Sequence, residues 1–383
     1  MAAGVEILTV ADPRHSREFI DLPWKLNAGD PDWVPPLRMA VAKLLDTRHY
    51  PFFRHGEAAF FLARRGEEVV GRIAAMDNRL HAGKYNDGRG FFGLFECEDD
   101  TEAARALLAE AARWCRGKGR THLRGPLNYS LNDEAPGVLV DGFNGPPLLL
   151  MAHNPRYYGP LLQRAGLSQC KDLYAYLVTR ATMADERFQR VMNAVRRRAP
   201  ALQLRPMRMQ SKGFRQDLQT MLDIFNTAWA DNWGFIPVTP PEVDAIAADL
   251  KPIVRPELTA IAEAEGKPVA MMVCVPNVNE LLLQIPDGRL FPTGWSKLLT
   301  GLKRIRGFRT MLMGVAPEYR NRGVDALMID HVIQAGIAGG FTYCELSWVL
   351  DDNQAMNSLA DKAGGRRYRT YRLFEGSNDA LLA

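Results

Sequence analysis

Long apolar segments, paired cysteines and metal-binding spacings are all missing from this sequence of 383 residues. No run of about 18 apolar residues occurs, so we do not expect a membrane-spanning helix. The N-terminus has no basic segment followed by an apolar one, which is the pattern of a secretory signal. The five cysteines are far apart and odd in number, which argues against a disulfide framework and a CxxC metal site. These absences predict a cytoplasmic protein without a bound metal.

The same order of expected strands and helices occurs twice along the chain, which predicts two domains of roughly 180 residues each. In the first half we expect two strands joined by a turn at 65–68, strands at 91–96, 122–126 and 173–178, an alanine-rich helix at 101–117 and a helical segment at 154–166. In the second half we expect strands at 258–263, 268–275, 310–315, 343–349 and 368–374, and helices at 214–230, 324–339 and 354–363. The fold class is therefore α/β, with two tandem domains that are each a mixed, mostly antiparallel sheet flanked by helices. We place the domains at 1–180 and 200–383, with a basic linker helix at 181–199.

The segment that follows the expected strand at 310–315 has the composition of a phosphate cradle. A tight loop with Arg320, Arg322 and Gly323 leads directly into the helix at 324–339. A helix entered in this way offers unpaired backbone N–H groups and a partial positive charge to an anion. The two arginines add full charges beside these groups, so the loop is expected to bind a phosphate.

The same loop resembles the signature Arg/Gln-x-x-Gly-x-Gly/Ala of the GNAT superfamily (GCN5-related N-acyltransferases), which holds the pyrophosphate of acyl-CoA. Arg320 and Gly323 match this signature, and Asp325 stands where the family has Gly or Ala. A second run, Asn353 to Gly364, is similar to another family motif, but Ala360 replaces the tyrosine that protonates the departing thiolate in many relatives. The resemblance implies a tandem GNAT acyltransferase whose donor is acyl-CoA or a phosphopantetheine-bound acyl group. The residues expected to bind this donor are Val315, Arg320, Asn321, Arg322, Gly323, Val324, Asp325 and Asn353.

The strand at 343–349 carries the leading candidate for a catalytic base. Glu345 and Ser347 fall on one face of it by alternation, while apolar residues occupy the other face. A carboxylate in such a strand is either the partner of a nearby arginine or a tuned base. Tyr368 is a further catalytic candidate, although a tyrosine on a strand usually serves packing. Glu134, in a polar segment of the first half, is a second candidate base, and a turn would explain the same segment.

Other segments suggest where an acceptor binds. Trp229 lies at the end of the helix expected at 214–230, and Trp233 lies in the proline-rich loop that follows. This region often lines the acceptor site in the GNAT superfamily. Asn128 and Asn132 precede Glu134 and would also face the substrate. The apolar insertion at 281–294 is either a lid over a lipid-like substrate or plain packing between domains. In the first half, acidic residues at 96–100 occupy the place of the phosphate loop, so that domain is expected to be a degenerate copy on the acceptor side.

A large charge of one sign is also missing, since the net charge is only +4, but the basic residues are unevenly placed. Ten Arg or Lys residues and two acidic residues lie between Arg180 and Arg215. This belt is either a solvated helix face or a surface for an acidic partner. Such a partner could be an acyl carrier protein, the anionic surface of the inner membrane, or the CoA phosphates. It lacks interleaved aromatic residues, so nucleic acid is not expected.

Asp325 leaves two alternatives for the donor. If its carboxylate points at the loop, it opposes a diphosphate more than a single phosphodiester, which favours a carrier-bound donor. If it caps its own helix, CoA binding is left intact. Taken together, the sequence predicts an N-acyltransferase that moves an acyl group from a thioester to a small-molecule or lipid amine, for example a sphingoid base, as in tandem-GNAT proteins of the bacterial ceramide synthase type. The alternative is a catalytically inactive GNAT-fold protein that binds a ligand or a partner.

Overall fold

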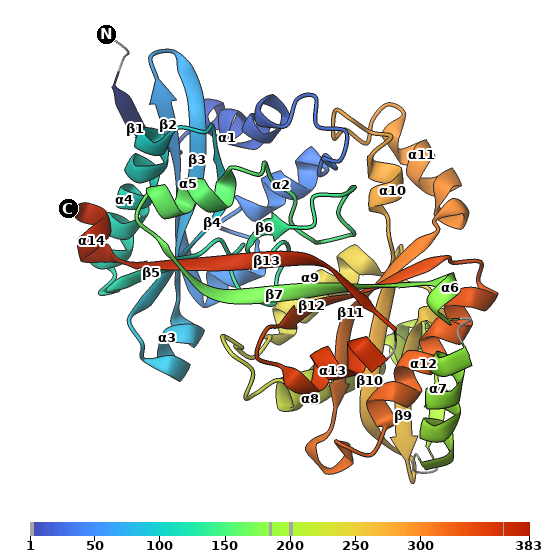
Figure 1. Cartoon of the computed structure of the whole chain (residues 1–383). Helices are drawn as coiled ribbons and strands as arrows, with labels where there is room; N and C mark the ends of the chain where they lie inside the picture. Colours follow the sequence, from blue (N-terminus) through green and yellow to red (C-terminus); the bar gives the residue numbers. More distant parts are fainter. Residues whose placement is uncertain (1–3, 184–185, 199–201, 363) are drawn as a thin grey trace. The chain divides into compact units, whose positions relative to one another are not determined.

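The computed structural model describes residues 4–183, 186–198, 202–362 and 364–383, and these fall into two compact units. Unit 1 consists of Met1–Asp172, Leu282–Lys297 and Arg369–Ala383, and unit 2 of Leu173–Leu281 and Leu298–Tyr368. Figure 1 shows the elements of both units along the chain. The predicted class is confirmed, because each unit is a mixed, mostly antiparallel sheet with helices.

Unit 1 is a sheet in the order β1-β2-β3-β4-β5-β13, and β6 also pairs with β13. Only β4 and β5 are parallel; the other pairs are antiparallel. Its strands are β1 (Val5–Thr9), β2 (Gly56–Arg65), β3 (Glu68–Asn78), β4 (Arg89–Cys97), β5 (His122–Gly125) and β6 (Val138–Asp141). Its helices are α1 (Pro13–Leu26), α2 (Arg38–Leu44), α3 (Arg79–Tyr85), α4 (Thr101–Gly117), α5 (Tyr158–Arg164) and α14 (Asn378–Leu382), and the 3₁₀ helix η1 covers Pro51–Arg54.

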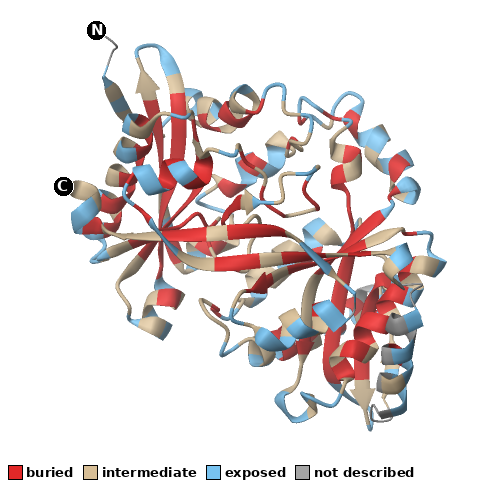
Figure 2. Ribbon diagram, in the orientation of Figure 1, coloured by how far each residue is buried: buried red, intermediate tan, exposed pale blue. Residues whose placement is uncertain are grey.

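The core of unit 1 is built on α4, whose bounds are those predicted from its alanine-rich sequence. Small and apolar residues repeat at helical spacing on its inner face, and Figure 2 shows buried strands beneath exposed outer helix surfaces. The helix begins after Asp100, whose side chain accepts hydrogen bonds from the N–H groups of Glu102 and Ala103. Asp100 is therefore the N-cap of α4.

Unit 2 has the strand order β7-β12-β11-β10-β9-β8, in which only β11 and β12 are parallel. Its strands are β8 (Gln203–Arg205), β9 (Thr259–Ala264), β10 (Lys267–Pro276), β11 (Gly307–Val315) and β12 (Tyr343–Leu350). Its helices are α6 (Arg180–Met183), α7 (Glu186–Arg198), α8 (Ser211–Ala228), α9 (Pro240–Leu250), α12 (Val324–Ala338) and α13 (Gln354–Lys362), with 3₁₀ helices η2 (Pro256–Leu258), η3 (Leu302–Arg304) and η4 (Pro317–Tyr319). The predicted helices at 181–199 and 354–363 include Ala184, Asp185, Ala199 and Ala363, which lie outside the described residues.

Four elements belong to both units: β7 (Ser168–Thr179), β13 (Arg366–Ser377), α10 (Asn279–Leu282) and α11 (Gly294–Gly301). The strand β7 ends the first half of the chain, yet it pairs with β12 of unit 2. The strand β13 ends the second half, yet it pairs with β5 and β6 of unit 1. The two halves therefore exchange their last strands, whereas the ranges predicted from the sequence were contiguous.

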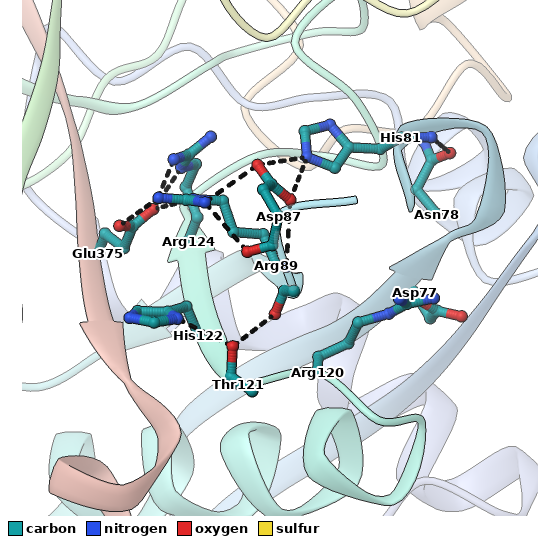
Figure 3. Close-up of polar contacts among 11 residues, drawn as sticks. Asp77, Asn78, His81, Asp87, Arg89, Arg120, Thr121, His122, Arg124 and Glu375 are labelled. Carbon is teal, nitrogen blue, oxygen red and sulfur yellow. Dashed lines mark hydrogen bonds and ion pairs between the residues drawn. The ribbon is translucent and has the colours of Figure 1, made fainter. Parts of the chain in front are cut away.

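A charge network fastens β13 to the parallel strands of unit 1, as Figure 3 shows. Arg89 on β4 and Arg124 on β5 each donate from Nε to Glu375 Oε2 on β13 at 2.7 Å. Asp87 accepts from the same Arg89 and contacts the buried His81, 3.1 Å from its Nε2. Burial lowers the pKa of His81 although Asp87 opposes the shift, and the two guanidinium groups lower the pKa of Glu375 more than its burial raises it.

Candidate functional site

The parallel strands β11 and β12 separate partway along their length and open unit 2 between them. Their pairing runs from Gly307 with Tyr343 to Thr310 with Leu346 and extends no further, although β11 continues to Val315 and β12 to Leu350. The register of β11 against β10 also shifts here, because Cys274 pairs with Thr310 and Val273 with Leu312, which leaves Met311 as a bulge. The open edge of β11 therefore begins at Met311.

A cavity of about 370 Å³ occupies this opening. Most of its walls are apolar side chains from β11, β12, α12 and α13, namely Met311, Met313, Ile329, Leu346, Val349, Leu350, Ala355 and Met356. Its polar residues come from β11, β12, the segment 319–325 and the loops after α8 and β12, namely Thr310, Ser347, Tyr319, Arg320, Asn321, Asp325, Asn232 and Asn353. A cavity with apolar walls and a few polar groups is the usual form of a small-molecule site.

The loop at the mouth of the cavity has the backbone of an anion cradle. Asn321 and Gly323 both have positive φ values, 59° and 78°, and α12 begins at the next residue. Within the described part of the chain, no hydrogen bond is seen for the N–H groups of residues 321–325, whereas the N–H of Leu327 already bonds Gly323 O within the helix. Together with the positive end of a helix of 15 residues, these N–H groups can receive a phosphate.

The two arginines of the loop have different environments. Arg320 lines the cavity, and its guanidinium donates to Ala228 O at 2.7 Å and to Val315 O at 3.4 Å. It thus clamps the loop to the end of α8 and to β11. Arg322 does not line the cavity; its guanidinium lies 5.5 Å from the centre of the Tyr319 ring. Of the residues predicted to bind the donor, Val315, Arg320, Asn321, Asp325 and Asn353 line the cavity, while Arg322, Gly323 and Val324 do not.

Asp325 combines the two alternatives left open by the sequence. Its Oδ1 accepts from the N–H of Ala326 at 2.8 Å in the first turn of α12, and the residue also lines the cavity. The carboxylate therefore bonds the helix N-terminus and stays beside the space that a phosphate would enter. It occupies the N–H group of Ala326, which follows the cradle, and adds a negative charge next to the cradle.

Glu345 is fully buried behind the cavity and has three partners. Ser347 Oγ and Tyr368 OH each donate a short hydrogen bond to one of its oxygens, and Arg309 Nε lies 3.7 Å from Oε1. Arg309, itself only 4% exposed, also donates to Ser347 Oγ at 2.7 Å. The structure thus leaves both alternatives for this carboxylate open. It has an arginine partner, and it is also hydrogen-bonded to Ser347, which could relay a proton to it as a base.

Ser347 connects this buried network to the cavity, because it lines the cavity and Glu345 does not. Its hydroxyl donates to Glu345 and accepts from Arg309, which leaves one lone pair of the oxygen for another group. Tyr368 meets Glu345 on the other oxygen and does not line the cavity. Burial raises the pKa of the Cys344 thiol well above its ordinary value, so that cysteine is not an activated nucleophile.

Trp229 shapes the cavity, whereas Trp233 does not line it. The indole of Trp229 donates to Met313 O at 2.8 Å and packs edge to face against Trp348, with ring centres 5.6 Å apart. Asn353 directly precedes α13, and its side chain accepts from the N–H of Met356 in the first turn of that helix. Position 360 is a fully buried alanine, which has no hydroxyl to offer the cavity.

The remaining predicted residues, Asn128, Asn132 and Glu134, lie in unit 1 between β5 and β6. Here β4 and β5 also separate, because their pairing ends at Phe91 and Arg124. This opening is filled by its own chain: Asn128 Oδ1 accepts from Leu94 N at 2.9 Å, and the N–H of Leu127 donates to Phe92 O at 2.7 Å. In unit 1, Asn128 therefore closes the place that is open in unit 2.

The acidic segment of unit 1 and part of the basic belt are held in ion pairs. Lys25 pairs with Glu98, Arg164 with Asp99 and Arg65 with Asp100. In unit 2, three arginines of the belt pair with carboxylates of the same unit: Arg196 with Asp330, and Arg205 and Arg208 with Asp217. These ion pairs give a structural role to residues of the acidic segment and of the basic belt, a role that composition alone did not assign.

Sequence reasoning missed one residue of the buried network, Arg309, and one residue of the cavity wall, Trp348. Arg309 precedes the expected strand at 310–315, and only the parallel register places it opposite Glu345. Trp348 was treated as part of an apolar strand face, but it lines the cavity against Trp229. In the described residues, no three His, Cys, Asp or Glu side chains are grouped as metal ligands, and no helix is long and apolar enough to cross a membrane.

Comparison with known proteins agrees with this geometry. Residues 218–364 match the model of the Acetyltransferase (GNAT) family. The chain is 38% identical over 382 residues to a bacterial ceramide synthase of Caulobacter vibrioides, and the match covers 97% of both chains. It is also 31% identical over 376 residues to protein YghO of Escherichia coli K12, and that match covers 96% of this chain and 94% of the relative. A tandem GNAT protein from the clavulanic acid pathway has a similar fold, with a TM-score of 0.55, 13% identity and 98% of each chain covered. The chain therefore belongs to the GNAT acetyltransferase family and is an acyltransferase of tandem GNAT architecture.

Proposed function

We propose that this protein is an N-acyltransferase that moves an acyl group from a thioester, of CoA or of an acyl carrier protein, to the amine of a long-chain base such as a sphingoid base. The observation that carries the proposal is the cavity between β11 and β12. It has a phosphate cradle at its mouth and the hydroxyl of Ser347, backed by Glu345, in its wall. No other described part of the chain combines these features.

The donor is assigned to this cavity by the chemistry of its walls. The N–H groups of residues 321–325 suit the phosphate, and Arg320 holds the loop in place. The edge of β11 beyond Thr310 is free of β12, so its peptide groups can pair with the amides of a pantetheine arm. Asp325 opposes a diphosphate more strongly than a single phosphodiester, which favours the carrier-bound donor.

The reaction forms one C–N bond and breaks one C–S bond. The neutral amine attacks the thioester carbonyl and loses a proton. The thiolate departs and takes a proton from solvent, so that an amide and a free thiol result. We assign the uptake of the amine proton to Ser347 Oγ, which passes its own proton to Glu345. Arg309 holds the Ser347 oxygen in position and balances the charge of the carboxylate.

The acceptor assignment rests on the apolar walls and on the named relative. Methionine, leucine, valine and tryptophan side chains line most of the cavity, as a long-chain substrate requires. The Caulobacter relative, named a bacterial ceramide synthase, is similar over nearly its whole length. These two facts support a long-chain base in preference to a small polar amine.

The test measures release of free thiol when the protein is given acyl-CoA or acyl carrier protein together with a panel of amines. We expect thiol release that depends on a long-chain amine. Gly323→Asp puts a charged side chain into the cradle at a backbone position with positive φ, so kcat/KM should fall at least about tenfold. The matched control is Gly340→Asp, at the other end of α12 and also at positive φ, with no atom within 4 Å of an added Cβ. Equal loss in both variants, or no thiol release with any donor, would refute the proposal.

A further inference from the structure

Three large apolar side chains of unit 1 are exposed to solvent. Phe291 is 75% exposed, Met39 63% and Trp295 48%. The indole N–H of Trp295 already donates to Pro292 O at 2.9 Å, so the part of the ring left in water is apolar. Leu299, 67% exposed, follows one turn later on α11 and is the only other large apolar residue of such exposure among those described.

Hydrogen bonds bring these side chains to one part of unit 1. The N–H of Arg38, the first residue of α2, donates to Gly288 O at 2.9 Å, and its Nε donates to Asp287 O at 2.8 Å. Trp24 of α1 donates to Pro286 O at 2.9 Å. The insertion predicted at 281–294 is thus attached to α1 and α2 within unit 1, and Met39 lies beside the segment that carries Phe291.

A basic hollow adjoins these apolar residues. Arg17, Arg38, Met39 and Arg289 line an open depression of about 790 Å³. Its acidic residues are engaged, because Asp21 pairs with Arg38, and Asp12 accepts from two N–H groups at the start of α1. Arg17 and Arg289 form no ion pair within the described ranges, so their charges are available to an anion.

We propose that this surface of unit 1, made of Met39, Phe291 and Trp295 beside the hollow of Arg17, Arg38 and Arg289, docks the protein on an anionic phospholipid bilayer. Tryptophan and phenylalanine lie well at the level of lipid headgroups, and guanidinium groups bind their phosphates. The three apolar side chains would bury roughly 500 Å² in all, less than the 800 Å² per partner of a standard protein interface. The charge and the small apolar area therefore favour a lipid surface, and the inference is independent of the reaction proposed above.

The test is flotation of the full chain with phosphatidylglycerol-rich vesicles, with pure phosphatidylcholine vesicles as the neutral reference. We expect binding to the anionic vesicles. Phe291→Ser with Trp295→Ser should weaken it about 30-fold, because two aromatic rings no longer enter the interface. Arg17→Glu with Arg289→Glu should weaken it at least about tenfold. The control pair, Lys84→Glu with Arg116→Glu on the exposed surfaces of α3 and α4, changes the net charge equally and should bind nearly as the unchanged protein does.

Insertion is tested separately by quenching of tryptophan fluorescence with lipids brominated in their acyl chains. Trp295→Phe should keep vesicle binding and lose most of the quenching. Circular dichroism checks that each variant is folded, and thiol release with a long-chain amine in the absence of vesicles should not change. No binding to anionic vesicles, or equal loss in the control pair, would overturn the proposal. Sedimentation velocity gives a further test. Concentration-dependent dimers that the Phe291 and Trp295 double variant abolishes would also overturn the proposal, because the surface would then join two copies of the chain.

Discussion

Replacing Glu345 with Gln separates a catalytic role of this residue from a structural one. The change keeps the shape of the side chain and removes its ability to accept a proton. If Glu345 takes the amine proton through Ser347, kcat should fall about 10²- to 10⁴-fold, the usual share of general base catalysis. KM for the donor should change little, because Glu345 does not line the cavity.

The structure also predicts the cost in stability. Arg309 is 4% exposed and would lose the carboxylate that lies 3.7 Å from its Nε. Removing one partner of a buried ion pair costs about 3 to 5 kcal/mol, and the remaining bonds from Arg309 to Ser347 reduce this. We therefore expect the free energy of unfolding to fall by about 3 kcal/mol.

The assay combines thiol release with denaturant unfolding and uses Glu280→Gln as the control. Glu280 is a carboxylate of the same unit that bonds Tyr343 OH at 2.8 Å and does not line the cavity, so its variant should lose stability and keep kcat. Ser347→Ala should lower kcat as much as Glu345→Gln, and the double variant should be no worse than either. A folded Glu345→Gln protein with kcat within about threefold of the original would refute the assignment.

Three further changes test other parts of the account. Burial would raise the pKa of Asp217, but the Arg208 and Arg205 guanidinium groups outweigh it and hold that pKa at about 2, below the value of about 3.9 in the unfolded chain. The ion pairs therefore stabilise the fold above about pH 4, and this stabilisation is lost as the pH falls toward 2. Asp217→Asn should lower the free energy of unfolding by about 2 kcal/mol at neutral pH and make it depend less on pH in acid. The exposed Asp223→Asn should do neither. Asp325→Ala should tighten CoA binding about threefold to tenfold in calorimetry, while Glu318→Ala, in the same loop but outside the cavity, should leave it unchanged. Gly93→Ala should unfold unit 1 at lower denaturant, since an added Cβ would lie 1.9 Å from a backbone oxygen.

The second half of the fold was largely predictable because its signals are local. The helix at 324–339 and the strand at 343–349 follow from apolar periodicity, and the loop before them from glycine and arginine spacing. The first half was less complete: α1 and α2 were not predicted, although Asp12 and Pro13 give α1 a local N-terminal signal. The exchange of β7 and β13 depends on pairing between distant strands, which no local pattern specifies.

The candidate site shows the same division. Arg320 and Asn321 were found from a contiguous motif and do line the cavity. The network around Glu345 required residues from three separate strands, so the partner Arg309 was not foreseen. Asn128 was assigned to substrate binding from its polar neighbours, but its Oδ1 bonds Leu94 N and fills the opening in unit 1, a role that depends on tertiary structure.

Mass spectrometry of the product tests the central claim most directly. The protein is incubated with an isotope-labelled acyl thioester and a long-chain base, and the amide and the free thiol are quantified together. The account predicts a labelled N-acyl product in a ratio of one amide per thiol released, at a rate lowered by Gly323→Asp and not by Gly340→Asp. Release of thiol without amide, or no amide from either acyl-CoA or acyl carrier protein, would contradict it.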